Sequence, residues 1–171
     1  MDVFAEQLIK KEKTTADYIK MGGIAAGAII LASLFMFLAM TMLFSFAIPA
    51  VLVLFLGVWL LGSTNVEYEY IITNNEMDID KIIGKRKRKR MITIDLSKGE
   101  DFGEYPPEET IKAEATVHAS SGLEKDAHYL VVKHEVYGTV NVIFNPNEKI
   151  REAIMQELPN SLRIKIKRNV K

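Results

Sequence analysis

The sequence contains no cysteine, and it has no surplus of either charge. Without cysteine the chain has no disulfide framework, no thiolate zinc site and no cysteine nucleophile. The absence of disulfides agrees with a reducing, cytoplasmic location for the soluble part of the chain. Since 22 basic residues balance 22 acidic ones, bulk charge favours neither nucleic acid nor an acidic substrate.

Motifs for nucleotide binding and catalysis are also missing, since no GxxxxGK[ST], GxGxxG or GxSxG occurs. The histidines are His118, His128 and His134. His128 and His134 share one face of a predicted strand but lie about 20 Å apart, too far for one metal ion. Two carboxylate pairs fit solvated faces better than acid–base pairs: Asp78 with Asp80, and Glu108 with Glu109. The sequence therefore predicts a protein that is not an enzyme, with no metal and no cofactor.

Charge is absent altogether from residues 21–62, a run of 42 residues. A helix rises about 1.5 Å per residue, so roughly 20 residues cross a hydrocarbon core of about 30 Å. The run is two spans long, which predicts a transmembrane hairpin with spans at about residues 17–43 and 48–61 and a turn at residues 44–49, where Pro49 disfavours helix at Ile48. A cleaved signal peptide fits poorly, because its apolar region is only about 7–15 residues long.

Within the hairpin, small and aromatic residues suggest how the spans are arranged. Gly23 and Gly27 form a small-xxx-small pair, which lets a second helix approach closely. The local candidate is the second span near Gly57, and a homo-oligomer is the alternative. Tyr18 and Trp59 are predicted to lie at the same membrane interface as an aromatic belt.

The orientation of the hairpin follows from the basic residues on its two sides. The predicted connecting loop contains none, whereas four lysines precede the hairpin, namely Lys10, Lys11, Lys13 and Lys20. By the positive-inside tendency both termini face the cytoplasm, in a plasma-membrane protein with two spans. Residues 1–13 are either an amphipathic helix on the membrane surface or a frayed terminus. Thr14, with Asp17 as the capping-box acid, starts the first span.

After a short linker at residues 63–65 the pattern changes to period two, which is typical of strands. Strands are expected at residues 66–72, 77–83 and up to Leu96, then at about 111–119, 127–137 and 139–145. Residues 97–110 are expected to be a loop, and Gly138 a turn. Asn145 is predicted to cap a helix with an apolar stripe of Ile150, Ala153, Ile154 and Leu158. Residues 160–171 are basic and fit either a strand or a tail.

This order of elements has a family resemblance. A strand ending in Thr73, a turn, a strand ending in Gly84, and a basic strand entering Ile92-Thr93-Ile94-Asp95-Leu96 together resemble the bacterial membrane-associated PH-like domain. The whole chain also resembles an uncharacterised family of small two-span membrane proteins of Gram-positive bacteria. The resemblance implies an antiparallel β-barrel or sandwich with a C-terminal capping helix, and no catalytic residues. The acidic stretch at residues 100–109 and the basic tail depart from the pattern.

The sharpest local feature is an unbroken basic run: Lys85, Arg86, Lys87, Arg88, Lys89 and Arg90. One interpretation is contact with anionic lipid head groups, at about 1 kcal/mol per basic residue near the surface. Nucleic acid is disfavoured because no aromatic side chain interleaves the run. The alternative without a ligand is a solvated strand pair whose charge is neutralised by Asp78, Asp80, Glu67 and Glu69.

The sequence thus predicts an α+β membrane protein with four parts: an N-terminal segment (1–16), a transmembrane hairpin (17–62), a cytoplasmic PH-like domain (63–159) and a basic tail or extra strand (160–171). The expected function is a non-catalytic module that contacts membrane lipids or a protein partner. The alternative is an accessory or scaffold subunit of a larger membrane complex.

Overall fold

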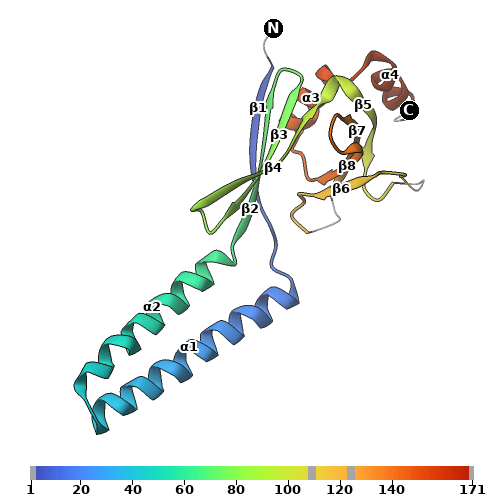
Figure 1. Cartoon of the computed structure of the whole chain (residues 1–171). Coiled ribbons are helices and arrows are strands. Elements are labelled where there is room, and N and C mark those ends of the chain that lie inside the picture. The colour runs from blue at the N-terminus through green and yellow to red at the C-terminus, as the bar shows by residue number, and fades with distance from the viewer. Residues whose placement is uncertain (1–2, 108–110, 123–125, 170–171) are drawn as a thin grey trace. The chain divides into compact units, whose positions relative to one another are not determined.

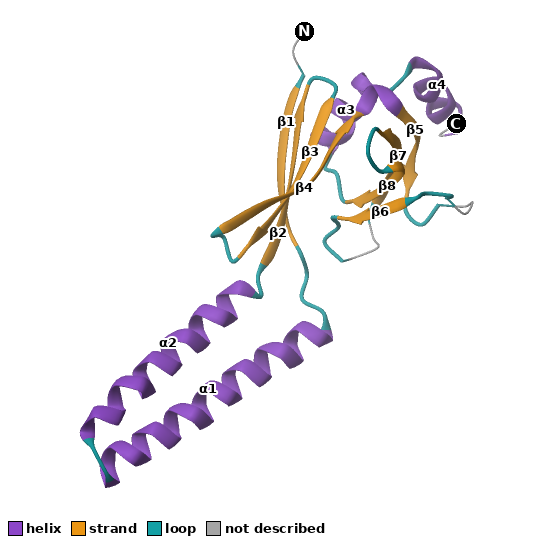
Figure 2. Ribbon diagram, in the orientation of Figure 1, coloured by secondary structure: helices purple, strands orange, loops and turns teal. Residues whose placement is uncertain are grey.

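The computed structural model describes residues 3–107, 111–122 and 126–169. The chain divides into two compact units, and each is described here by itself. The helical unit is Lys13–Val66, and the sheet unit combines Met1–Glu12 with Glu67–Lys171. Figure 1 follows the chain in order, and Figure 2 distinguishes the helices from the strands. The predicted pair Glu108 and Glu109 lies outside the described residues.

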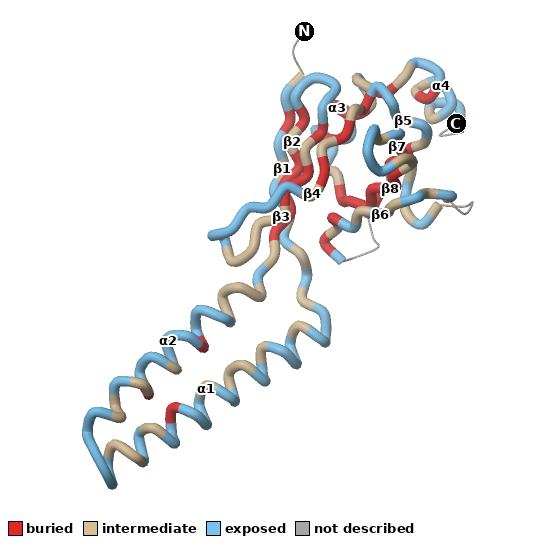
Figure 3. Tube along the Cα trace, in the orientation of Figure 1, coloured by how far each residue is buried: buried red, intermediate tan, exposed pale blue. Residues whose placement is uncertain are grey.

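The helical unit is an antiparallel pair, α1 (Thr15–Thr41) and α2 (Ala47–Ser63), joined by a 3₁₀ turn at Phe44–Phe46. The predicted capping box is confirmed, since Thr14 and Asp17 bond each other's backbone N–H groups at the start of α1. By length and composition both helices could cross a membrane, counting α2 from Phe44. Buried residues in them are few and small, namely Ala32, Ala50 and Gly57 (Figure 3).

The N-terminal segment is a strand, β1 (Phe4–Lys10), so the predicted helix or frayed terminus at residues 1–13 is wrong. It pairs antiparallel with β2 (Val66–Thr73) over seven residues, from Phe4 opposite Thr73 to Lys10 opposite Glu67. Alternate side chains are covered, and Ala5 is only 1% exposed. The helix prediction failed because β1 depends on a partner strand that follows the whole helical unit.

Sheet A has the order β1-β2-β3-β4, with β3 at Glu76–Ile83 and β4 at Lys87–Asp95. A two-residue turn joins β2 to β3, and Asn74 adopts a positive φ of 54° there, a conformation that asparagine tolerates. β3 and β4 pair antiparallel, with a bulge between Ile79 and Asp80. The strands predicted between residues 66 and 96 are therefore confirmed, although β4 begins within the basic run.

Sheet B has the order β5-β7-β8-β6, from β5 (Gly99–Glu104), β6 (Ala115–His118), β7 (His128–His134) and β8 (Gly138–Phe144). β5 lies where the sequence predicted a loop. The prediction failed because glycines and acidic residues are untypical of a strand, and the pairing with β7 stabilises this one. β6 runs parallel to β8, so the sheet is not wholly antiparallel. Sheets A and B are separate, and the described strands form no closed barrel.

The core of the sheet unit lies between the two sheets and the C-terminal helices (Figure 3). Tyr70 of β2 and Phe144 of β8 meet edge to face, with ring centroids 5.6 Å apart. Helix α3 (Glu148–Glu157) supplies buried Ile150 and Ile154, which confirms the predicted apolar stripe. Residues 160–169 form a helix, α4 (Asn160–Asn169), rather than a strand or tail.

The cap of α3 is Asn147, whose side chain accepts a bond from the Ile150 N–H at 2.9 Å. The prediction of Asn145 is wrong by two residues. The side-chain oxygen of Asn145 instead accepts the Ser121 N–H at 2.8 Å.

Candidate functional site

The basic run forms the turn between β3 and β4 and the first half of β4. The turn lies at the end of sheet A where Ile83 pairs with Lys87 and Lys10 pairs with Glu67. At that end the chain leaves β1 for α1 and returns from α2 to β2. Figure 1 shows this end of the β3–β4 hairpin extending away from sheet B.

The two arginines of β4 that face sheet A's outer side are held by carboxylates. Arg88 lies 2.8 Å from Oε2 of Glu69, and its second nitrogen donates to Oε1 at 3.0 Å. Arg90 bonds Asp80 and Asp78. Burial opposes the charge of Arg90, but the two aspartates outweigh it and raise the pKa of the guanidinium. Two of the six residues in the basic run, Arg88 and Arg90, thus have the internal neutralisation expected of a strand pair.

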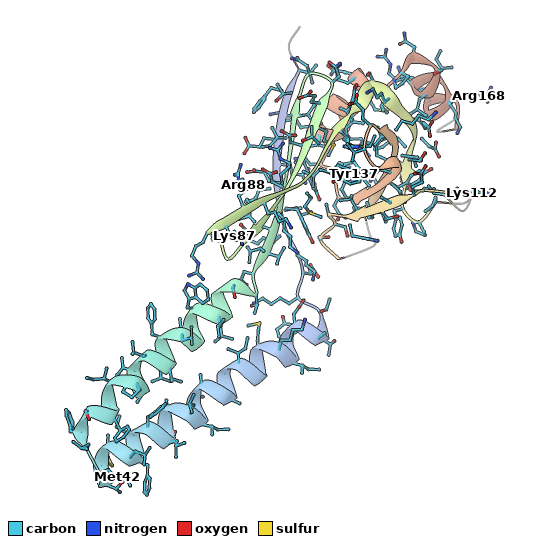
Figure 4. All side chains as sticks on the ribbon, viewed as in Figure 1. Met42, Lys87, Arg88, Lys112, Tyr137 and Arg168 are labelled. Atoms are coloured by element: carbon cyan, nitrogen blue, oxygen red, sulfur yellow. The ribbon has the colours of Figure 1, made fainter. Side chains whose placement is uncertain are left out.

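The lysines point to the other face of the same hairpin. Lys89 lies directly opposite Lys81, and Lys87 opposite Ile83. Lys85, Lys87 and Lys89 are exposed, and Figure 4 shows Lys87 extending from the start of β4. In the part of the chain that the structure describes, no carboxylate pairs with any of them. We call Lys81, Lys85, Lys87 and Lys89 the lysine cluster.

An opposed pair of like charges destabilises a strand pair, and an anion beside it relieves the repulsion. Lys81 and Lys89 form such a pair. The lysine cluster, which joins the three lysines of the basic run to Lys81 of β3, is therefore the part of this hairpin that is available to an external anion. Its ammonium groups act as point charges, without the planar fork with which arginine grips a single phosphate.

In the helical unit, the glycine that packs is Gly57. A Cβ added to Gly57 would lie 2.7 Å from the Cβ of Ala28, so the helices touch there. Gly23 and Gly27 have no described atom within 4 Å of an added Cβ. The prediction that they pack against the second span is thus wrong for the contact within this hairpin, where Ala28 is the residue of α1 that contacts Gly57.

Tyr18 and Trp59 lie at different levels along the hairpin. Because Gly57 is level with Ala28, Trp59 is level with a position near residue 26, about 12 Å from Tyr18 at 1.5 Å per residue. One headgroup layer is roughly 5–8 Å deep. The structure therefore does not support a shared level for both rings, and their role as interface anchors stays a prediction.

A hydrogen-bond network joins β1 to the rest of the sheet unit, and the sequence analysis missed it. Gln7 donates to the Asn145 carbonyl at 3.0 Å and accepts the Asn147 N–H at 2.8 Å. The Tyr70 hydroxyl donates to the Ala119 carbonyl at 2.5 Å, and burial raises the pKa of that hydroxyl. Gln7 shares a strand face with the apolar residues Ala5 and Ile9, which was the available clue, but its partners are over 130 residues away.

The histidines do not gather into a site. His128 stacks on Phe102 with ring centroids 5.6 Å apart, and burial lowers the pKa of its imidazole. His134 accepts the Val136 N–H at 3.1 Å within the β7–β8 turn. Among the described residues no three histidines or carboxylates are placed to hold a metal ion. A concavity of about 1700 Å³ runs beside β5 and mixes acidic with basic side chains, so its lining favours no single ligand chemistry.

Two four-stranded sheets that share a core with the helix α3 fit a PH-like domain, a class that is generally non-catalytic. The chain belongs to the family described as Bacterial PH-like domain (DUF6106), whose model matches residues 1–164. That match includes β1 and both apolar helices as well as the two sheets. Comparison with curated proteins and with solved structures gave no match.

Proposed function

We propose that this chain is a membrane-anchored PH-like module. In this proposal α1 and α2 cross the plasma membrane as a hairpin, the sheet unit lies in the cytoplasm, and the lysine cluster contacts anionic lipid head groups. Four lysines on the polar side of the hairpin, from Lys10 to Lys20, support the cytoplasmic orientation.

The pairing of β1 with β2 is the observation that carries this proposal. Lys10 lies opposite Glu67, and the two strands flank the helical unit in the sequence. Both ends of that unit must therefore emerge on the same side of a bilayer, which requires an even number of crossings. A hairpin satisfies this condition, whereas a single crossing would separate β1 from its partner.

The lengths of the two apolar segments support the same arrangement. With Gly57 level with Ala28, the end of α2 at Ser63 is level with about residue 22 of α1. The uncharged part of α1 and the segment Phe44–Ser63 are therefore each about 30 Å long, the thickness of a hydrocarbon core. Asp17 and Lys20 fall beyond that length, on the polar side.

Chain connectivity limits how far the lysine cluster can lie from such a bilayer. Residues 11–14 join β1 to α1, and residues 64 and 65 join α2 to β2. The shorter connection sets the limit, since two extended residues span at most about 7 Å, which is within the Debye length of about 8–10 Å at physiological salt. Each lysine near an anionic surface contributes about 1 kcal/mol.

Amine labelling of the full chain in lipid nanodiscs tests the lipid contact. We expect Lys85, Lys87 and Lys89 to be acetylated several-fold more slowly in discs with about 30% phosphatidylglycerol than in neutral discs, and high salt to remove the difference. Lys149, exposed on α3, is the internal control. Equal labelling of the cluster in both kinds of disc would refute the lipid contact.

A second candidate function is an accessory or scaffold subunit of a larger membrane complex. The β7–β8 turn favours it, because Val136 and Tyr137 are exposed there. Gly23 and Gly27 also leave one side of α1 open. Purification from native membranes in mild detergent distinguishes the two functions, since a stoichiometric partner protein supports the subunit and its absence supports the lipid-contacting module.

A further inference from the structure

We infer that the β1–β2 pair is a mechanical relay, which converts movement of α1 relative to α2 into a change in sheet A and at the start of α3. This inference goes beyond anchoring, because it assigns the sheet unit a response to the state of the helix pair. It depends on the connections, on the register of β1 and on the contacts of Gln7.

The connections between helices and strands contain almost no free residues. The Glu12 N–H donates to the Ser121 carbonyl at 2.6 Å, and Thr14 caps α1, so Lys13 alone separates these two anchors. On the other side the Asn65 N–H bonds the Gly62 carbonyl at 3.3 Å, and β2 begins at the next residue. A displacement of either helix therefore acts directly on its strand.

β1 cannot absorb a small displacement by sliding along β2. A slip of one residue turns every side chain to the opposite face, which would expose Ala5 and break the bonds of Gln7. A slip of two residues preserves the faces but requires about 7 Å of movement. Smaller movements of the helices must instead weaken the pairing of β1 with β2.

Gln7 carries the effect from β1 to α3. Its side-chain oxygen accepts the backbone N–H of Asn147, and the side chain of Asn147 caps α3 by accepting the Ile150 N–H. When β1 moves away from its register, Gln7 leaves Asn147, and the first turn of α3 loses support. The relay thus runs from the helix pair through β1 to α3 by covalent and hydrogen bonds.

The test separates α1 from α2 and measures amide hydrogen exchange in the full chain in uncharged detergent. Gly57→Leu forces the helices apart, since even a Cβ there lies 2.7 Å from Ala28. Gly23→Leu is the matched control, because a Cβ added there has no atom of another described segment within 4 Å. We expect Gly57→Leu to raise exchange in β1 and at the start of α3 roughly tenfold, and Gly23→Leu to leave both unchanged.

Inserting six glycine and serine residues between Glu12 and Thr14 supplies slack, and in the Gly57→Leu background it should restore slow exchange in β1. Equal exchange in the two leucine variants would overturn the relay, and so would a rise that the insertion does not reverse. If Gly57→Leu unfolds the whole chain, Gly57→Ala replaces it, with a local rise supporting the relay and no rise refuting it. No anionic lipid is present, so the result is independent of the lysine cluster.

Discussion

Phe55 on α2 is 69% exposed, whereas Phe144 on β8 is fully buried, and this contrast holds between the two units that contain them. The helical unit shows large apolar side chains to its surroundings and buries only small residues at its seam. The sheet unit buries most of its large apolar side chains, among them Tyr70, Phe144 and Leu130. A hydrophobic segment therefore does not by itself mark the core of the protein, because the burial of its side chains depends on what surrounds the helix or strand.

The two units also differ in how far apart their contacts lie in the sequence. α1 and α2 are joined by a short turn and pack through residues such as Ala28 and Gly57. The sheet unit is completed by β1, whose partner follows the entire helical unit. We therefore expect changes in the sheet unit to leave the helical unit folded. The stability of the sheet unit instead depends on two strands, β1 and β2, that lie before and after the helical unit in the sequence.

Deleting residues 3–10 should have the largest effect on this comparison. The deletion removes the edge of sheet A and both bonds of Gln7, and we expect it to cost at least about 5 kcal/mol, comparable to the whole net stability of a small domain. Limited proteolysis should then cut the sheet unit while α1 and α2 remain intact. The double change Phe4→Ser and Leu8→Ser affects only exposed side chains and is the control. Equal sensitivity of both variants would contradict a structural role for β1.

Replacing phenylalanine by alanine in each unit tests the contrast with matched chemistry. Phe144→Ala should destabilise the sheet unit by about 3–5 kcal/mol, since it empties a buried site beside Tyr70. Phe55→Ala should leave the stability of the sheet unit within about 0.5 kcal/mol of the parent protein. Thermal unfolding of the purified chain, followed by tyrosine circular dichroism, measures both. A similar loss in the two variants would show that the units do not unfold separately.

A smaller effect is expected from Tyr70→Phe, which removes one buried hydroxyl and keeps the ring. The Ala119 carbonyl and the Asn145 N–H then lose their partner, at a cost of about 1–2 kcal/mol. Tyr137→Phe is the control, because that side chain is exposed at the β7–β8 turn. Denaturant titration should give a lower unfolding midpoint for Tyr70→Phe than for Tyr137→Phe. Identical midpoints would show that the hydroxyl of Tyr70 does not stabilise the core.

The smallest expected effect is a pH dependence that belongs to the sheet unit alone. Burial lowers the pKa of His128 below its usual value of about 6.5, so the folded chain binds a proton less readily than the unfolded chain. The contribution of neutral His128 is complete above about pH 6.5 and decreases as the pH falls toward the lowered pKa. Melting temperatures across this range should fall more steeply for the parent protein than for His128→Gln. Parallel profiles would exclude His128 as the cause.

Much of the fold was predictable from local pattern. The charge-free run located both helices within a few residues, and alternation located β2, β3 and the apolar half of β4. The capping box at Thr14 and the buried stripe of α3 followed from neighbouring residues in the same way. These features depend on interactions within about one turn of helix or one strand, so the sequence carries them directly.

The candidate site was predictable as a basic run with its lysines on one face of a strand and its arginines on the other. Alternation along a strand separates lysines from arginines, but it does not say which face meets carboxylates. The register of β4 against β3 and β2 decided that Arg88 and Arg90 meet Glu69, Asp78 and Asp80. The same register opposed Lys81 to Lys89 and left the lysine cluster without acidic partners among the described residues.

By itself the sequence determined that this protein has two apolar helices followed by a β-rich domain, because uncharged length and residue alternation are local properties. Only the tertiary structure decided that β1 belongs to that domain, that β5 is a strand, and that β6 runs parallel to β8. Each of these depends on backbone hydrogen bonds to a segment distant in sequence, and the free energy of such pairing is not contained in either segment alone.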